Sequence, residues 1–380
     1  MFSDIDRKKA NKVRTITSIL QKTPVDALRK CAVTEFGFVN NIQRSAVWPI
    51  LIDVDKQDEK RYHRNMDREH RDIDQVAKDV DRSMWRFTRG KSKLRNTKRE
   101  ELTRIINAIL ASHPQLHYFQ GYHEIGSILL LVTNEPTSFR LLERLSLNHI
   151  SDCMKPSFAE VSKILNLLFP LLLLMDKDVY RFLIDSNVQP MFAISWIITW
   201  FSHNFEELEP TARLFDYFLS THPLAPLYFS AVVDDLLKLP CAYDTVHNYF
   251  TNLPEELPLD HLIKQTQSLL VKIPPKKLQD EAKIQLDKDS PMTNYPFSWM
   301  TKGKSQLQKP TIFKLSFFLV FGTICILSLS VFIQLMKQSN SAIAYGDLTN
   351  YLKSINQPIF KHASSLYSGL RSLVKHYIGY

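Results

Sequence analysis

The stretch QLHYFQGYHE, residues 115–124, joins two segments of helical character. An amphipathic segment ends at His113-Pro114 before it, and the apolar run 125–132 follows it, which predicts a polar, aromatic turn between two helices. Gly121 permits a backbone angle that other residues rarely adopt, and this can push Gln120 out of the surface. A glutamine offers two donors and an acceptor, enough to hold a water molecule and a backbone group together. The simpler alternative is a tight helix junction with tyrosines packed beneath it.

A second pattern, I-x-x-D-x-x-R, stands upstream with Val76 in its first position. Val76, Asp79 and Arg82 are spaced three apart, so they fall along one side of a helix. A carboxylate one turn before an arginine can hold its guanidinium in place. The simpler alternative is an ion pair on a solvated helix face, which contributes only a few tenths of a kcal/mol.

A third pattern, R-x-x-x-W-x-x-L, covers residues 44–51. Its simpler explanation is a helix that buries Trp48 and ends at Pro49. Taken alone, each of these three patterns carries little information.

Composition favours a helical protein. Of the 380 residues 44% are hydrophobic and only 9 are Gly, and helical spacing is common, so we expect an all-α fold. Residues 97–112 form the clearest amphipathic helix, with Thr97 and Glu100 in a capping-box pattern. The apolar runs 164–175 and 191–201 are too short for the ~20 residues that cross a bilayer, so they are expected to be buried core helices. Pro170 should kink the first run, and the core should hold three aromatic residues of the second: Trp196, Trp200 and Phe201.

The ends of the chain differ from its middle. Residues 1–22 are basic and lack the apolar core of a signal peptide, so we expect the N-terminus to stay in the cytosol. Thr23-Pro24 is typical of a helix start and begins a domain expected at 23–273. Inside it, the charged residues 53–72 should form a solvated connector. Residues 274–314 are expected to be a mostly flexible linker with one possible helix near 278–286.

Residues 315–336 contain no charged side chain. At ~1.5 Å per residue this run is about 33 Å long, enough to cross a bilayer. A buried core helix is the alternative, but the expected linker before it favours a transmembrane helix. The lysines upstream, at 302, 304, 309 and 314, outnumber those just downstream, so the positive-inside bias keeps the N-terminal side cytosolic. The tail 337–380 would be lumenal, and its amphipathic helix 359–378 suits a membrane interface, a partner helix or disorder.

Several kinds of chemistry are not indicated. Gly90-Lys91-Ser92 is similar to the end of a P-loop, but Trp85 stands where the upstream glycine is required. The 4 Cys are scattered without metal-ligand spacing. The net charge of +9 lies largely at the N-terminus and beside the apolar run, which favours a membrane role over nucleic-acid binding.

In this order, the three patterns resemble the signature of the TBC domain of GTPase-activating proteins for Rab GTPases. The resemblance spans roughly residues 25–275 and includes FAISWIITWF at 192–201 and RLFD at 213–216. The phrase PQLHYFQGYH at 114–123 is similar to that of the subfamily anchored in the endoplasmic reticulum membrane.

This resemblance implies a two-lobed helical domain and two catalytic side chains supplied in trans to the Rab. Arg82 matches the arginine finger and Gln120 the glutamine finger, with Asp79 bracing Arg82. Tyr118 and Gly121 would shape the loop that carries Gln120. Val76 stands where Ile is usual, a conservative departure.

The implied activity is acceleration of GTP hydrolysis without an independent enzyme activity. GTP and Mg²⁺ belong to the Rab, so no cofactor is expected. The subfamily suggests an early-secretory Rab of the ER-to-Golgi step, and an endoplasmic reticulum (possibly early Golgi) membrane location with the catalytic domain in the cytosol. The alternative is a catalytically silent Rab-binding scaffold or membrane tether. An adaptor, however, does not need both Arg82 and Gln120.

Overall fold

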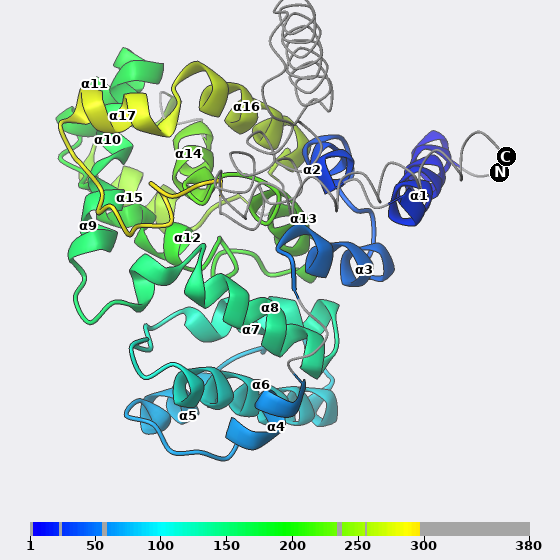
Figure 1. The fold of residues 1–380 in the computed structure, drawn as a ribbon. Coiled ribbons are helices and arrows are strands. Elements are labelled where there is room, and N and C mark those ends of the chain that lie inside the picture. The colour runs from blue at the N-terminus through cyan, green and yellow to red at the C-terminus, as the bar shows by residue number, and fades with distance from the viewer. Residues whose placement is uncertain (1–2, 23–24, 55–58, 234–237, 255–256, 297–380) are drawn as a thin grey trace, which may run out of the picture. The chain divides into compact units, whose positions relative to one another are not determined.

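The computed structural model describes residues 3–22, 25–54, 59–233, 238–254 and 257–296, and every regular element in these ranges is helical (Figure 1). The predicted all-α class is therefore confirmed for them. The expected transmembrane run 315–336 and the tail 337–380 lie outside the described residues. Within the described part of the chain, no helix combines the length and apolar character that a membrane span needs.

The first group of helices is built around α6, Ser92–Ser112. It packs against α4 (Glu59–Asn65), α5 (Ile73–Asp81), α7 (Tyr122–Val132) and α8 (Glu135–Leu147). The predicted apolar stripe of α6 is buried, but the helix begins at Ser92, so the capping box expected at Thr97 was wrong. The extra first turn is held by Arg95, whose guanidinium lies 3.4 Å from the centre of the Trp85 ring.

The second group contains η2 (Ser151–Met154), α9 (Ala159–Asn166), α10 (Leu168–Met175), α11 (Lys177–Asp185), η3 (Pro190–Ala193) and α12 (Ile194–Ile198). It continues with α13 (Leu208–Phe218), α14 (Ala225–Val232), α15 (Tyr243–Thr251), α16 (Leu259–Lys272) and α17 (Pro275–Ala282). At its centre α14 packs against α10, α12 and α16. The two groups, seen below and above in Figure 1, correspond to the two lobes that the family resemblance implied.

The two apolar runs of this group are both interrupted. The first divides at Leu167, between α9 and α10, close to the expected kink at Pro170. The second is not one helix of about a dozen residues, because α12 ends at Ile198 and Trp200 and Phe201 then take φ values of +53° and +65°. This strained turn lets both aromatic side chains enter the core beside Trp196, as expected.

Three segments are more ordered than the sequence indicated. In α1 (Asp4–Lys22), Ile16 is fully buried and the helix contacts α2 (Val25–Val33) and α3 (Asn41–Leu51). The connector expected at 53–72 contains α4, whose Tyr62 is buried against Phe139. Beyond 273, the one helix expected near 278–286 is present a few residues earlier as α17, and it buries Leu278 against the core. In each case a long-range apolar contact stabilises a segment whose local sequence is polar.

Candidate functional site

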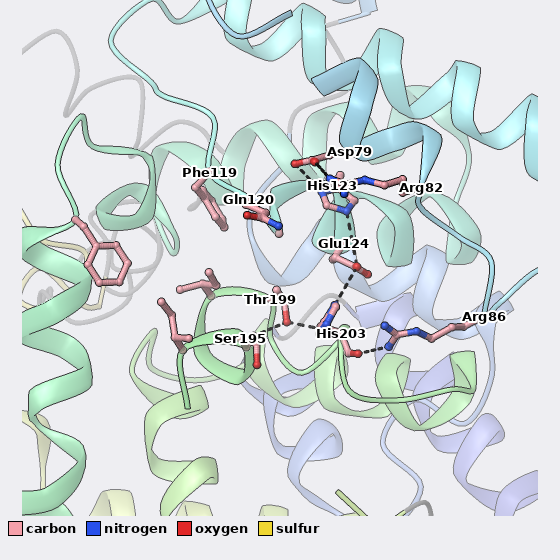
Figure 2. Close-up of a pocket in the computed structure, with 14 residues that line it drawn as sticks. Asp79, Arg82, Arg86, Phe119, Gln120, His123, Glu124, Ser195, Thr199 and His203 are labelled. Atoms are coloured by element: carbon pink, nitrogen blue, oxygen red, sulfur yellow. Dashed lines mark hydrogen bonds and ion pairs between the residues drawn. The ribbon is translucent and has the colours of Figure 1, made fainter. Parts of the chain in front are cut away.

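A cleft of about 630 Å³ brings together residues from both groups of helices. Figure 2 shows it, with Asp79, Arg82, Gln120, His123 and Thr199 among its labelled residues. The full lining is Asp79, Arg82, Arg86, Phe119, Gln120, Gly121, His123, Glu124, Phe158, Ile194, Ser195, Ile198, Thr199 and His203. Both sequence-predicted finger positions, which are far apart in the sequence, therefore lie at one cleft.

Arg82 lies at the C-terminal end of α5. Val76 and Val80 are buried on the inner face of this helix, and Arg82 is its C-cap residue. The Arg82 side chain is 68% exposed, whereas the side chain of Asp79 is completely buried. Nη2 of Arg82 donates to Oδ1 of Asp79 across 2.6 Å, so the expected bracing contact is present. The simpler alternative of a wholly solvated ion pair is wrong, because one partner is in the core.

Asp79 is held by three side chains. Besides Arg82, Nε2 of Gln75 donates to its Oδ1 at 3.0 Å and the hydroxyl of Tyr118 donates to its Oδ2 at 3.0 Å. Burial raises the pKa of Asp79, but hydrogen bonds from Arg82, Gln75 and Tyr118 outweigh it and bring the pKa below its ordinary value. The carboxylate is therefore ionised at neutral pH and joins the arginine to the loop before α7.

That loop, residues 113–121, is fixed at several points. The backbone N–H of His117 donates to the carbonyl of Met154 at 2.8 Å, and that of Tyr118 donates to Oδ2 of Asp72 at 3.1 Å. Tyr122 is fully buried beneath the loop, and its hydroxyl is 2.7 Å from Oγ of Ser146. The tight helix junction over a packed tyrosine that the sequence offered as an alternative is therefore present, and Gln120 is exposed above it.

Gly121 is the position where the loop requires glycine. Its φ is +109°, in a region that side chains rarely adopt. A Cβ atom built there would lie 2.8 Å from Cγ2 of Thr199. Thr199 is itself fixed, since its Oγ1 donates to the carbonyl of Ser195 at 2.6 Å. The closeness of α7 to the turn after α12 therefore determines how Gln120 is presented.

The sequence did not assign a role to the other polar residues that line the cleft. Nδ1 of His123 is 2.9 Å from the Tyr118 hydroxyl, and Glu124 Oε1 is 3.3 Å from Nδ1 of His203. Arg86 donates to the backbone carbonyl of His203. His123 and Glu124 end the quoted stretch 115–124, so the only sequence signal was their nearness to Gln120.

The motif FAISWIITWF contributes Ser195 and Thr199 to the cleft, whereas R-x-x-x-W and RLFD meet elsewhere and serve the fold. Asp216 of RLFD is completely buried and accepts bonds from Nε1 of Trp48 at 2.8 Å and the N–H of Phe38 at 3.0 Å. Nε of Arg44, also completely buried, lies 3.2 Å from Asp216, and the same guanidinium bonds Glu209. Burial raises the pKa of Asp216, while Arg44 acts in the opposite direction. The pattern R-x-x-x-W therefore builds a buried polar anchor between α3 and α13.

Comparison with known proteins agrees with this architecture. The fold is that of a Ypt/Rab GTPase-activating domain: the structure of the Ypt/Rab-GAP domain of Gyp1p matches with a TM-score of 0.59 at 16% identity, over 70% of this chain and 99% of that one. The family model of the Rab-GTPase-TBC domain matches residues 41–238. The chain belongs to this family, which confirms the resemblance inferred from its motifs.

Two relatives show similarity along the sequence. The chain is 37% identical to TBC1 domain family member 20 of Homo sapiens over 292 residues, covering 74% of this chain and 72% of that protein. It is 34% identical to the GTPase-activating protein gyp10 of Schizosaccharomyces pombe over 184 residues, covering 46% of this chain and 49% of that protein.

Proposed function

We propose that this chain accelerates GTP hydrolysis by a Rab GTPase by inserting Arg82 and Gln120 into the nucleotide site of the Rab. The observation that carries the proposal is that these two side chains come from the end of α5 and from the loop before α7, are both exposed, and line one cleft. GTP and Mg²⁺ would be those bound by the Rab, as the family resemblance implies. Membership of the Rab-GTPase-TBC domain family supports the choice of substrate class.

The two side chains have complementary chemistry. A GTPase is slow on its own because charge that develops on the transferred phosphoryl group is incompletely compensated, and an external arginine accelerates it roughly 10³–10⁵-fold. Arg82 can bond phosphate oxygens while one of its nitrogens stays on Asp79, because a guanidinium has five N–H donors. Gln120 can orient the attacking water through its amide.

Exchange of each finger, with a neighbour as control, tests the proposal. The full-length chain is added to a panel of GTP-loaded Rab proteins, and phosphate release is timed. Arg82→Lys keeps the charge but loses the planar fork, so we expect a drop of at least about 10³-fold with Rab binding retained. Gln120→Ala should have a similar effect. Arg89→Lys and Gln115→Ala, which change exposed residues outside the cleft lining, should not.

Further exchanges separate the proposal from its alternative. The wild-type chain should still accelerate a Rab whose own catalytic glutamine has been replaced, since Gln120 supplies the missing group. Rab binding with no acceleration by the wild-type chain would instead identify a silent scaffold or tether.

We propose in addition that residues 315–336 anchor the chain in the endoplasmic reticulum membrane (or early Golgi) and that the Rab belongs to the early-secretory class. The absence of charged residues in this run and the lysines before it support the anchor and its orientation. The full-length chain should resist extraction by alkaline carbonate. An acceptor site for N-glycosylation engineered near Gln357 should be modified. Protease cleavage of an unmodified tail in sealed microsomes would contradict a lumenal tail.

A further inference from the structure

His123 lies between the loop that carries Gln120 and the end of α5 that carries Arg82. It belongs to the first turn of α7, two residues after Gly121, and only 8% of it is exposed. Its Nδ1 lies 2.9 Å from the Tyr118 hydroxyl and 3.9 Å from Oδ2 of Asp79. Figure 2 shows it directly beside Asp79 and Arg82 at the cleft.

The positions of the protons follow from the partners. An ionised Asp79 can only accept, so the single hydroxyl proton of Tyr118 points to Asp79, at 3.0 Å. Burial raises the pKa of Tyr118, so the hydroxyl keeps this proton. The remaining partner of the Tyr118 oxygen, at 2.9 Å, must then be a donor, which requires a proton on Nδ1 of His123.

The other ring nitrogen completes the assignment. Nε2 of His123 is 3.7 Å from Oε1 of Glu124, beyond hydrogen-bond distance. Burial lowers the pKa of His123, although Glu124 and Asp79 act in the opposite direction. A neutral ring protonated on Nδ1 therefore fits the contact with the Tyr118 hydroxyl.

We propose that His123 is a positioning residue for both fingers, because its Nδ1–H orients the Tyr118 hydroxyl that holds Asp79, and Asp79 holds Arg82. The chain of hydrogen bonds runs from α7 through Tyr118 to the end of α5, so it links the loop that carries Gln120 to Arg82. Consecutive hydrogen bonds of this kind polarise and strengthen one another. The role in catalysis rests on the proposed function, whereas the hydrogen-bond chain itself does not.

Three substitutions separate positioning from mere packing. In His123→Asn the side-chain amide can replace Nδ1–H as the donor to Tyr118. In His123→Gln the amide reaches the place of Nε2 instead, and His123→Leu supplies no donor. For His123→Gln and His123→Leu we expect kcat of the activated hydrolysis to fall about 10- to 100-fold with little change in KM. His123→Asn should keep most of the wild-type kcat. His222→Leu, which removes a half-buried histidine that does not line the cleft, is the control and should leave kcat unchanged.

Two measurements complete the test. Tyr118→Phe combined with His123→Leu should be no worse than the more severe single variant, because both break the same chain. Independently of any Rab, the ¹⁵N shifts of His123 in the full-length protein should report the tautomer protonated on Nδ1.

Protonation on Nε2, or equal kcat for the Gln and wild-type chains, would overturn the positioning role. If the wild-type chain accelerated no GTPase, the proposed function would fail, and the tautomer would still decide whether the hydrogen-bond chain exists.

Discussion

Replacement of Gly121 by Ala tests how the cleft presents Gln120. The new Cβ atom would lie 2.8 Å from Cγ2 of Thr199, closer than carbon atoms approach without displacement. The side chain of Thr199 cannot easily turn away, because its Oγ1 donates to Ser195 and the residue is buried. Relief must therefore come from movement of the loop that carries Gln120.

The magnitude has two parts. A non-glycine residue at positive φ costs about 1–2 kcal/mol, and overpacking a well-filled site costs about 1–3 kcal/mol. We expect Gly121→Ala to lower the free energy of unfolding by about 2–5 kcal/mol, within the ~5–15 kcal/mol of a folded domain. A shift of the loop by about 1 Å should reduce activated GTP hydrolysis roughly 100-fold.

Two further variants separate these parts. Thr199→Ser removes Cγ2 but keeps the hydroxyl. The double variant Gly121→Ala with Thr199→Ser should therefore recover the free energy of unfolding that overpacking costs, and much of the activity. Gly90→Ala tests the backbone part alone, because Gly90 has a φ of +69° and no atom within 4 Å of the added Cβ. Urea unfolding measures the loss of stability, and phosphate release from the Rab measures the loss of activated GTP hydrolysis. Wild-type activity and stability in Gly121→Ala, or no recovery in the double variant, would refute the reasoning.

Two predictions concern stability. Asp216→Asn should lower the free energy of unfolding by about 3–5 kcal/mol in urea, because it removes the charge that compensates the buried Arg44. Glu209→Gln changes the exposed partner of the same arginine and should lower it by under about 1 kcal/mol. Equal losses for the two variants would contradict this ranking. Burial lowers the pKa of His149 to about 3 and that of His222 to about 4, from 6.5, so both stabilise the fold above pH 6.5 and lose this contribution as pH falls toward those values. At pH 5 each histidine should lower the free energy of unfolding by about 2 kcal/mol relative to pH 7. A midpoint of urea unfolding that is the same at the two pH values would disprove this.

The sequence alone was sufficient for features that local patterns determine. Helical spacing predicted the all-α class, and the apolar stripe ending at Ser112 predicted the last turns of α6. Glycine next to Gln120 predicted an exposed glutamine on a tight turn, because the allowed backbone angles of one residue decide that geometry. The motif order was enough to identify the family, while the catalytic roles of Arg82 and Gln120 stay predictions.

Tertiary structure decided what depends on residues distant in the chain. No local pattern shows that Asp216 pairs with Arg44, 172 residues away in the sequence, or that Thr199 leaves no room for a side chain at Gly121. The role proposed for His123 likewise needs Tyr118 to meet Asp79, 39 residues earlier. Such contacts depend on how helices pack, and packing is a property of the whole fold that the spacing of residues along one helix does not contain.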